Sequence, residues 1–169
     1  MKPVREQVVM ITGATDGLGR ALAMELAKRG ATLLLHGRSD ERGKAVIEEI
    51  RRQTPTAALQ FYRADLSRLS EVRAMSDRVA AEHDRLDALV NNAGVYNDGR
   101  QVSVDGVELA FQVNYLSHVL LTRVLLPLLK KTAPARIVNV ASAGQSALDF
   151  DDLMLERSYD GGVSYRRSK

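Results

Sequence analysis

The stretch Thr12-Gly13-Ala14-Thr15-Asp16-Gly17-Leu18-Gly19 decides the fold, because it joins a short apolar run to an amphipathic pattern. The run before it, Val8 to Ile11, is continuously apolar and predicts a strand buried on both faces. After it, apolar residues recur at helical spacing until Gly30, which predicts a helix with a glycine C-cap. A strand, a glycine-rich turn and a helix in this order are typical of a dinucleotide-binding site, where helix N–H groups meet the pyrophosphate.

The three glycines of this stretch have separate expected roles. Gly13 allows the tight turn, Gly17 lets the backbone approach the pyrophosphate, and Gly19 lets the helix pack closely on the sheet. The alternative is that the glycines only make a turn between a strand and a helix. The position directly after the first buried strand favours the cofactor interpretation.

The same alternation continues along the chain. Apolar runs predict four further strands, at residues 32–36, 59–63, 86–90 and 136–140. Helical patterns lie between them, at residues 40–52, 67–83 and 107–131. The helix at 67–83 is expected to have Ser67 as its N-cap with Glu71 behind it, and the helix at 107–131 is interrupted near its end by Pro127. We therefore predict an α/β, Rossmann-type, doubly wound parallel sheet in a single domain over residues 1–169, with an aperiodic loop at 144–162.

Composition narrows the class of protein. The 169 residues include 24 Lys and Arg against 21 Asp and Glu, and this mild, interspersed charge gives no indication of a nucleic-acid partner. Cysteine is absent, and His36, His83 and His118 are scattered, so we expect no metal site. We read neither a signal peptide nor a transmembrane segment, and expect a cytoplasmic protein.

The residues after the second predicted strand favour one nicotinamide cofactor. NAD sites usually place a carboxylate there for the ribose 2′-hydroxyl, whereas this chain has no acid before Asp40. Arg38 can give bidentate hydrogen bonds to a 2′-phosphate, and Ser39 can add a hydroxyl. We therefore predict NADP(H), with NAD(H) as the alternative. The competing interpretation of Arg38 is a solvated loop cation.

Six motifs in order make the chain similar to the short-chain dehydrogenase/reductase family. They are Thr12 to Gly19, Asp65-Leu66, Asn91 to Gly94, Asn114, Ser142 and Tyr165 to Lys169. The long insert between Ser142 and Tyr165 resembles the retinol-dehydrogenase-like branch of NADP-dependent carbonyl reductases. The resemblance implies the strand order 3-2-1-4-5.

The resemblance also implies a reaction, hydride transfer between the nicotinamide and a carbonyl or alcohol carbon of a small, apolar substrate. Tyr165 is then the acid/base, and Lys169, four residues on, supplies the cation that stabilises its phenolate. Ser142 is expected to hydrogen-bond the substrate oxygen, and Asn114 to anchor a water that links Lys169 to solvent. The alternative for Asn114 is a hydrogen-bonded core amide.

The remaining implied residues hold the cofactor, with Asp65 at the adenine. The full expected set is Gly13, Thr15, Asp16, Gly17, Leu18, Gly19, Arg38, Ser39, Asp65, Leu66, Asn92, Ala93, Gly94, Tyr165 and Lys169. Tyr96 and Tyr159 are further candidates for the pocket wall, with surface placement as the alternative for each.

The sequence ends at Lys169, whereas members of this family continue with a sixth strand, a substrate loop and further elements. We expect the fifth strand to lie at a sheet edge, and the helix at 107–131 to present an apolar face suited to a homo-oligomer. A helix at 164–169 is expected to fray, which would leave Tyr165 poorly oriented. The chain is then part of a longer protein, a true truncation, or completed by a partner chain; we favour the first. A catalytically inactive NADP-binding or interaction module is the alternative function.

Overall fold

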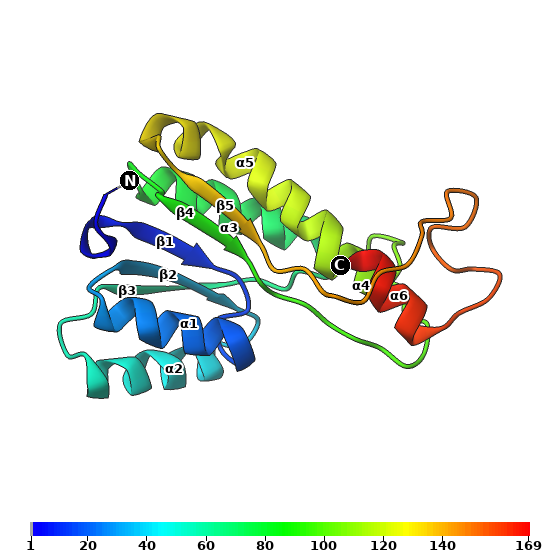
Figure 1. Ribbon diagram of the computed structural model, residues 1–169, viewed down its shortest axis with the longest axis horizontal. Coiled ribbons are helices and arrows are strands. Elements are labelled where there is room, and N and C mark those ends of the chain that lie inside the picture. Colours follow the sequence, from blue (N-terminus) through cyan, green and yellow to red (C-terminus); the bar gives the residue numbers. More distant parts are fainter. Residues whose placement is uncertain (1) are drawn as a thin grey trace.

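The computed structural model describes residues 2–169 and contains one five-stranded parallel sheet of order β3-β2-β1-β4-β5 (Figure 1). The strands are β1 (Val8–Ile11), β2 (Thr32–Gly37), β3 (Leu59–Arg63), β4 (Ala88–Asn91) and β5 (Arg136–Asn139). In the centre of the sheet, Met10 of β1 pairs with Leu34 of β2 and with Leu89 of β4. The predicted fold class and strand order are confirmed.

Helices cover both faces of this sheet. In chain order they are η1 (Val4–Glu6), α1 (Gly17–Lys28), α2 (Asp40–Gln53), α3 (Leu69–Glu82), α4 (Leu109–Phe111), the π-helical turn η2 (Gln112–Leu116), α5 (Ser117–Thr132) and α6 (Gly161–Ser168). Figure 1 shows α1 and α2 on one face of the sheet and α3 and α5 on the other. The C-cap of α1 is Arg29, one residue before the predicted Gly30; Gly30 follows with φ +82° and ends the helix in the left-handed conformation.

Two apolar cores fill the space between the sheet and its helices. On the α1 and α2 side, Val9 and Ile11 pack with Ala23 and other small or branched side chains. On the α3 and α5 side, Met10 packs with Leu121 and its neighbours. Alternate residues of β1 thus serve opposite cores, which is why its sequence is apolar throughout. Burying each such side chain contributes about 1.5–3 kcal/mol to stability.

The start of α3 differs from the prediction. Ser67 is not the N-cap; the helix begins at Leu69 after Arg68, which makes no capping hydrogen bond with its side chain. Asp65 Oδ1 accepts the N–H of Ser67 (2.9 Å) and forms a turn first, and Glu71 Oε2 accepts the N–H of Asp65 (2.9 Å). These side-chain bonds order the end of the β3–α3 loop, and the N-cap lies one residue later than predicted.

The long apolar helix also differs from its predicted limits of 107–131. It begins at Leu109, because the carboxylate of Glu108 accepts the N–H groups of Ala110 and Phe111 as an N-cap. The helix continues through Pro127 to Thr132, so the expected interruption does not end it. Within it, the π-helical turn η2 contains Asn114.

This helix, Leu109–Thr132, is long and apolar enough to span a membrane, a property that the sequence reading missed. Length and composition alone are weak evidence of a membrane span, because the core helix of a soluble protein has the same properties. In this structure 44% of its most apolar window is buried. Buried leucines of α5, among them Leu121 and Leu125, belong to the core it shares with α3.

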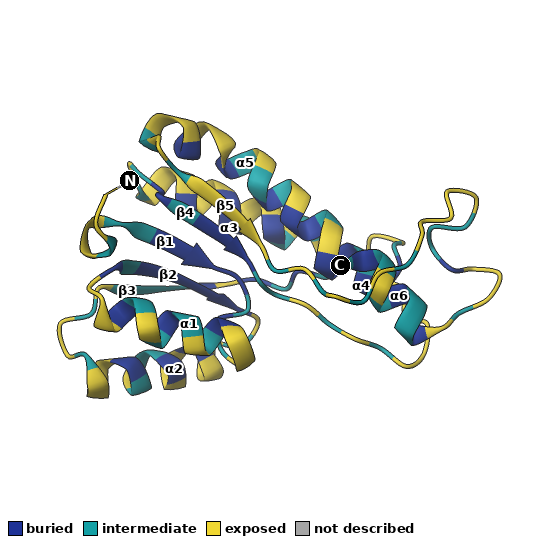
Figure 2. Ribbon diagram, in the orientation of Figure 1, coloured by how far each residue is buried: buried dark blue, intermediate teal, exposed yellow. Residues whose placement is uncertain are grey.

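The sheet edge at β5 is exposed, as predicted. Among the described residues β5 pairs with β4 alone, and all four of its residues are exposed (Figure 2). Ile137 and Val138 remain 40% and 44% exposed.

The last helix is better supported than the sequence predicted. It begins at Gly161 rather than 164, because Asp160 Oδ1 accepts the N–H of Val163 (2.7 Å) as an N-cap. Arg167 then donates to the main-chain oxygens of Ala147 (2.9 Å) and Asp152 (3.3 Å) in the preceding loop. Tyr165 lies within this eight-residue helix, and Lys169 follows it as the C-cap residue.

Candidate functional site

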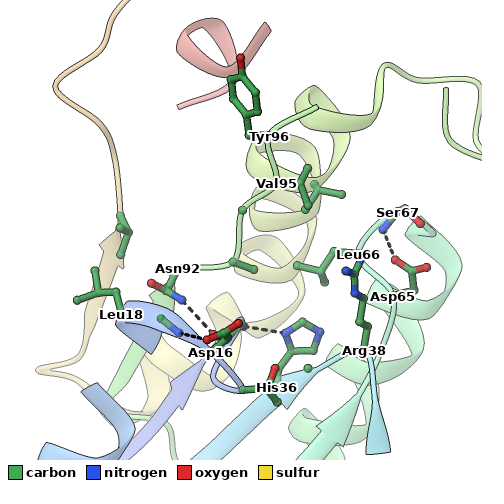
Figure 3. A pocket seen from close by; sticks show the side chains of 18 of the residues that line it. Asp16, Leu18, His36, Arg38, Asp65, Leu66, Ser67, Asn92, Val95 and Tyr96 are labelled. Carbon is green, nitrogen blue, oxygen red and sulfur yellow. Dashed lines mark hydrogen bonds between the residues drawn. The ribbon is translucent and has the colours of Figure 1, made fainter. Parts of the chain in front are cut away.

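A cavity of about 640 Å³ lies at the carboxyl ends of the strands. Most of the predicted cofactor residues line it, although they come from segments far apart in the sequence. Those that do are Gly13, Thr15, Asp16, Gly17, Leu18, Arg38, Asp65, Leu66, Asn92, Ala93, Gly94, Tyr165 and Lys169. Gly19 and Ser39 are the predicted residues that do not line it. Figure 3 shows Arg38 beside Asp65 and Leu66, with Tyr96 at the far end from His36.

The glycine turn is a cradle that side chains would fill. Gly13 has φ +65°, and a Cβ there would lie 2.9 Å from Ala93 Cα. A Cβ on Gly19 would lie 2.3 Å from the carbonyl oxygen of Gly13, so the first turn of α1 rests directly on the preceding loop. Gly17 opens α1 with nothing within 4 Å of its Cβ position, which leaves room on the cavity side. This arrangement fits a pyrophosphate held by backbone N–H groups.

Thr12 connects the glycine turn to the segment after β4. Its Oγ1 accepts the N–H groups of Asn92 (2.9 Å) and Ala93 (3.0 Å). Asn92 Nδ2 returns a hydrogen bond to the main-chain oxygen of Thr12 (2.8 Å). Asn91, the first residue of the predicted motif, points elsewhere and donates to Asn139 Oδ1 (2.8 Å). These bonds fix the wall between the two ends of the cavity.

The end of the cavity beside β2 is cationic. Arg38 lines it, and so does Arg42, which the sequence reasoning missed. Arg42 lies in the first turn of α2, directly after the loop that carries Arg38. Ser39 has a different place from the one predicted: its Oγ accepts the N–H of Arg42 (3.2 Å) as the N-cap of α2.

His36 is a second residue whose role the sequence did not reveal. It is buried at the end of β2 and lines the cavity. Its Nδ1 accepts the N–H of Gly13 (3.2 Å), and its Nε2 lies 3.1 Å from the main-chain oxygen of Ala64. Burial lowers the pKa of His36 to about 4, so the ring is neutral at pH 7.

Tyr165, in α6, and Lys169, its C-cap residue, line the opposite end of the cavity. The ring of Tyr96 lies 5.9 Å from that of Tyr165, so of the two further candidates Tyr96 belongs to the wall. Tyr159 does not line the cavity; its hydroxyl donates to the main-chain oxygen of Asn97 (3.0 Å). Burial lowers the pKa of Lys169, whose ammonium is half-buried.

Asn114 holds α6 in place. Its Oδ1 accepts the N–H of Val95 (2.7 Å), and its Nδ2 donates to Val95 O (3.0 Å) and Ser168 Oγ (2.8 Å). Both Nδ2 donor bonds are thus made within the protein, as the core-amide alternative expects, and the amide ties α6 to the segment after β4. Asn114 and Lys169 also face a second hollow, of about 520 Å³, together with His118.

Ser142 lies outside both hollows. Its Oγ accepts the N–H of Gly144 (3.1 Å) in the loop after β5, while Val140 and Ala141 line the main cavity. Its proton stays available as a donor. Within residues 2–169 no group of three or more His, Asp or Glu side chains is placed to hold a metal ion.

Two buried histidines make stability depend on pH. Burial, and secondarily the Lys169 ammonium, lowers the pKa of His118 to about 4, the value that burial gives His36. An unfolded histidine titrates near 6.5, so between these values the unfolded chain binds protons that the folded chain does not. Stability is therefore expected to fall as pH decreases through this window, with the unfolding constant rising up to about tenfold per pH unit for each histidine.

Urea unfolding between pH 7 and 5 measures this slope. In the His118→Gln variant the slope is expected to be about half that of the unchanged protein. An identical slope in the two proteins would contradict the burial of a neutral His118.

Comparisons with known proteins agree with this geometry. The family model for short chain dehydrogenase matches residues 7–148. Mouse retinol dehydrogenase 13 is 40% identical over 166 residues, which are 96% of this chain and 50% of that protein. Human retinol dehydrogenase 14 is 40% identical over 178 residues, covering 96% of this chain and 53% of that protein. The chain thus spans about half the length of the curated relatives it matches.

Solved structures have the same fold. A Mycobacterium paratuberculosis protein of uncharacterised function superposes with a TM-score of 0.82 at 32% identity, covering 97% of this chain and 57% of that one. A metagenomic short-chain oxidoreductase in complex with NADP has a TM-score of 0.74 at 28% identity, covering 96% of this chain and 71% of that one.

Proposed function

The chain belongs to the short-chain dehydrogenase family, and on that premise we propose that the protein is an NADP(H)-dependent oxidoreductase acting on a carbonyl or alcohol. One observation carries the proposal. A single cavity joins a backbone cradle at the glycine turn, two arginines at one end, and Tyr165 with Lys169 at the other. These are the parts that binding a phosphorylated dinucleotide and moving a proton require.

The residues fit NADP(H) from end to end. The N-terminus of α1 opens on the cavity at Gly17 and Leu18, which suits it to a pyrophosphate. Arg38 and Arg42 suit a 2′-phosphate, and no carboxylate occupies the end of β2 to favour a 2′-hydroxyl. The NADP complex of the metagenomic relative supports the same choice. Asp65 and Leu66 lie where the adenine is expected.

The bound cofactor supplies a hydride at its nicotinamide. Tyr165 delivers a proton to the carbonyl oxygen during reduction and takes it back during oxidation. The Lys169 ammonium, which lines the same end of the cavity, is proposed to stabilise the negative charge that forms on the Tyr165 oxygen. Asn114 positions Lys169 through Ser168. The role of Ser142 as a donor to the substrate oxygen stays a prediction, because Ser142 does not line the cavity.

The wall near Tyr165 indicates the substrate class. The ring of Tyr96 lies beside that of Tyr165, and the cavity lining includes the apolar side chains of Val95, Val140 and Ala141. We therefore propose a substrate whose carbonyl or hydroxyl carbon carries apolar groups.

Tyr165→Phe tests the acid/base assignment. The variant keeps the aromatic ring and loses the proton donor, so turnover of aldehydes and ketones is expected to fall by at least about a hundredfold while NADPH binding is unchanged. NADPH oxidation at 340 nm and NADPH fluorescence titration measure the two properties. Full activity in the variant would refute the role of Tyr165. NADPH binding without turnover in the unchanged protein would instead support a binding module.

Arg38→Ala and Arg42→Ala test the 2′-phosphate site. Each change removes a charge-assisted hydrogen-bond donor, so each is expected to raise the dissociation constant for NADPH by about tenfold or more and to leave that for NADH nearly unchanged. Arg51→Ala is the matched control, because Arg51 lies in the last turn of α2, the helix that carries Arg42, and does not line the cavity. An equal effect on both nucleotides would exclude a 2′-phosphate contact.

A further inference from the structure

One buried imidazole lies between the two walls of the cofactor cavity. His36 is 3% exposed, and the described contacts of its ring are with main-chain groups of two other segments. Gly13 belongs to the turn after β1, and Ala64 to the segment after β3. Neither contact is part of the proposed catalytic chemistry, so the ring has a function still to be assigned.

The two contacts fix the tautomer of His36. Because Gly13 N–H donates to Nδ1, that nitrogen is unprotonated, and Nε2 carries the proton that it gives to Ala64 O. An imidazolium would present donors on both sides and leave the Gly13 N–H without an acceptor. Asp65, next to Ala64, is the charged group that favours protonation, yet burial outweighs it and lowers the pKa of His36.

The same residue also holds the next amide of the turn. The main-chain oxygen of His36 accepts the N–H of Ala14 (2.8 Å). Two successive N–H groups, of Gly13 and Ala14, are thus bound by the ring and the backbone of one residue. This pair sets the direction in which the turn leaves β1, and with it the direction of the N–H groups that follow at the start of α1.

We propose that His36 is a positioning residue for the cofactor: its neutral ring, anchored at Ala64 O, accepts the N–H of Gly13 and so holds the glycine turn that forms the pyrophosphate side of the cavity. The inference rests on the proposed NADP(H) function. Both hydrogen bonds of the ring contribute to stability, but only the bond to Gly13 holds the turn that faces the pyrophosphate. The effect of the ring on the affinity for NADPH is therefore separable from its effect on stability.

Two amide variants separate the two bonds. In His36→Asn, Oδ1 takes the place of Nδ1 and can accept from Gly13, whereas the shorter chain cannot reach Ala64 O. In His36→Gln, the terminal amide takes the place of Nε2 and can donate to Ala64 O, whereas Gly13 N–H loses its acceptor. Each variant keeps one hydrogen bond, so each serves as the matched control for the other.

NADPH fluorescence titration and thermal unfolding of the purified protein are the readouts. Both variants are expected to lose a similar amount of thermal stability. The dissociation constant for NADPH is expected to stay within about threefold in His36→Asn and to rise about tenfold or more in His36→Gln. Equal dissociation constants in the two variants, or changes that follow thermal stability, would overturn the positioning role. Absence of NADPH binding by the unchanged protein would instead refute the proposed function itself.

If the variants do not fold, a measurement on the unchanged protein tests the same proposal. Long-range ¹H–¹⁵N correlation NMR reports the tautomer of His36 directly, and the Nε2–H form is expected with and without NADPH. Hydrogen exchange of the Gly13 amide is expected to slow when NADPH is added. An Nδ1–H ring, which cannot accept from Gly13, would overturn the proposal.

Discussion

The whole site depends on a backbone-to-backbone approach, that of Gly19 in α1 to the carbonyl of Gly13. A Cβ on Gly19 would lie 2.3 Å from that oxygen and 2.5 Å from Asn92 Nδ2, so no other residue fits without a shift of the main chain. The close approach brings the N-terminus of α1 next to the carboxyl end of β1. Thr12 and His36 then fix the turn from its two sides.

From this constraint the parallel topology assembles the rest. Because the strands are parallel, their carboxyl ends all lie on one side of the sheet. The turn after β1, the arginines after β2 and the segment after β4 therefore meet there, although they are far apart in sequence. Tyr165 and Lys169 arrive by another route, on α6, which Asn114 ties to the segment after β4. Cofactor binding and proton transfer thus share one cavity while depending on separate anchors.

The sequence predicted what local patterns encode, namely the glycine turn, the alternation of strands and helices, and Arg38. It failed where a side chain takes a backbone group as partner across the fold. Ser67 was predicted to be an N-cap, but its N–H is bound by Asp65 in a turn before the helix. Asn114, in a π-helical turn, donates to the main-chain oxygen of Val95. His36 gave no signal, because its two partners lie 23 and 28 residues away. Localisation and self-association stay predictions.

The direct measurement of the central claim is calorimetric titration of the purified protein with NADPH and with NADH. The two arginines that follow β2 and the absence of a carboxylate at the end of that strand predict that NADPH binds about tenfold or more tightly than NADH, with the preference decreasing as salt screens the 2′-phosphate. Tighter binding of NADH, or no binding of either nucleotide, would contradict the account.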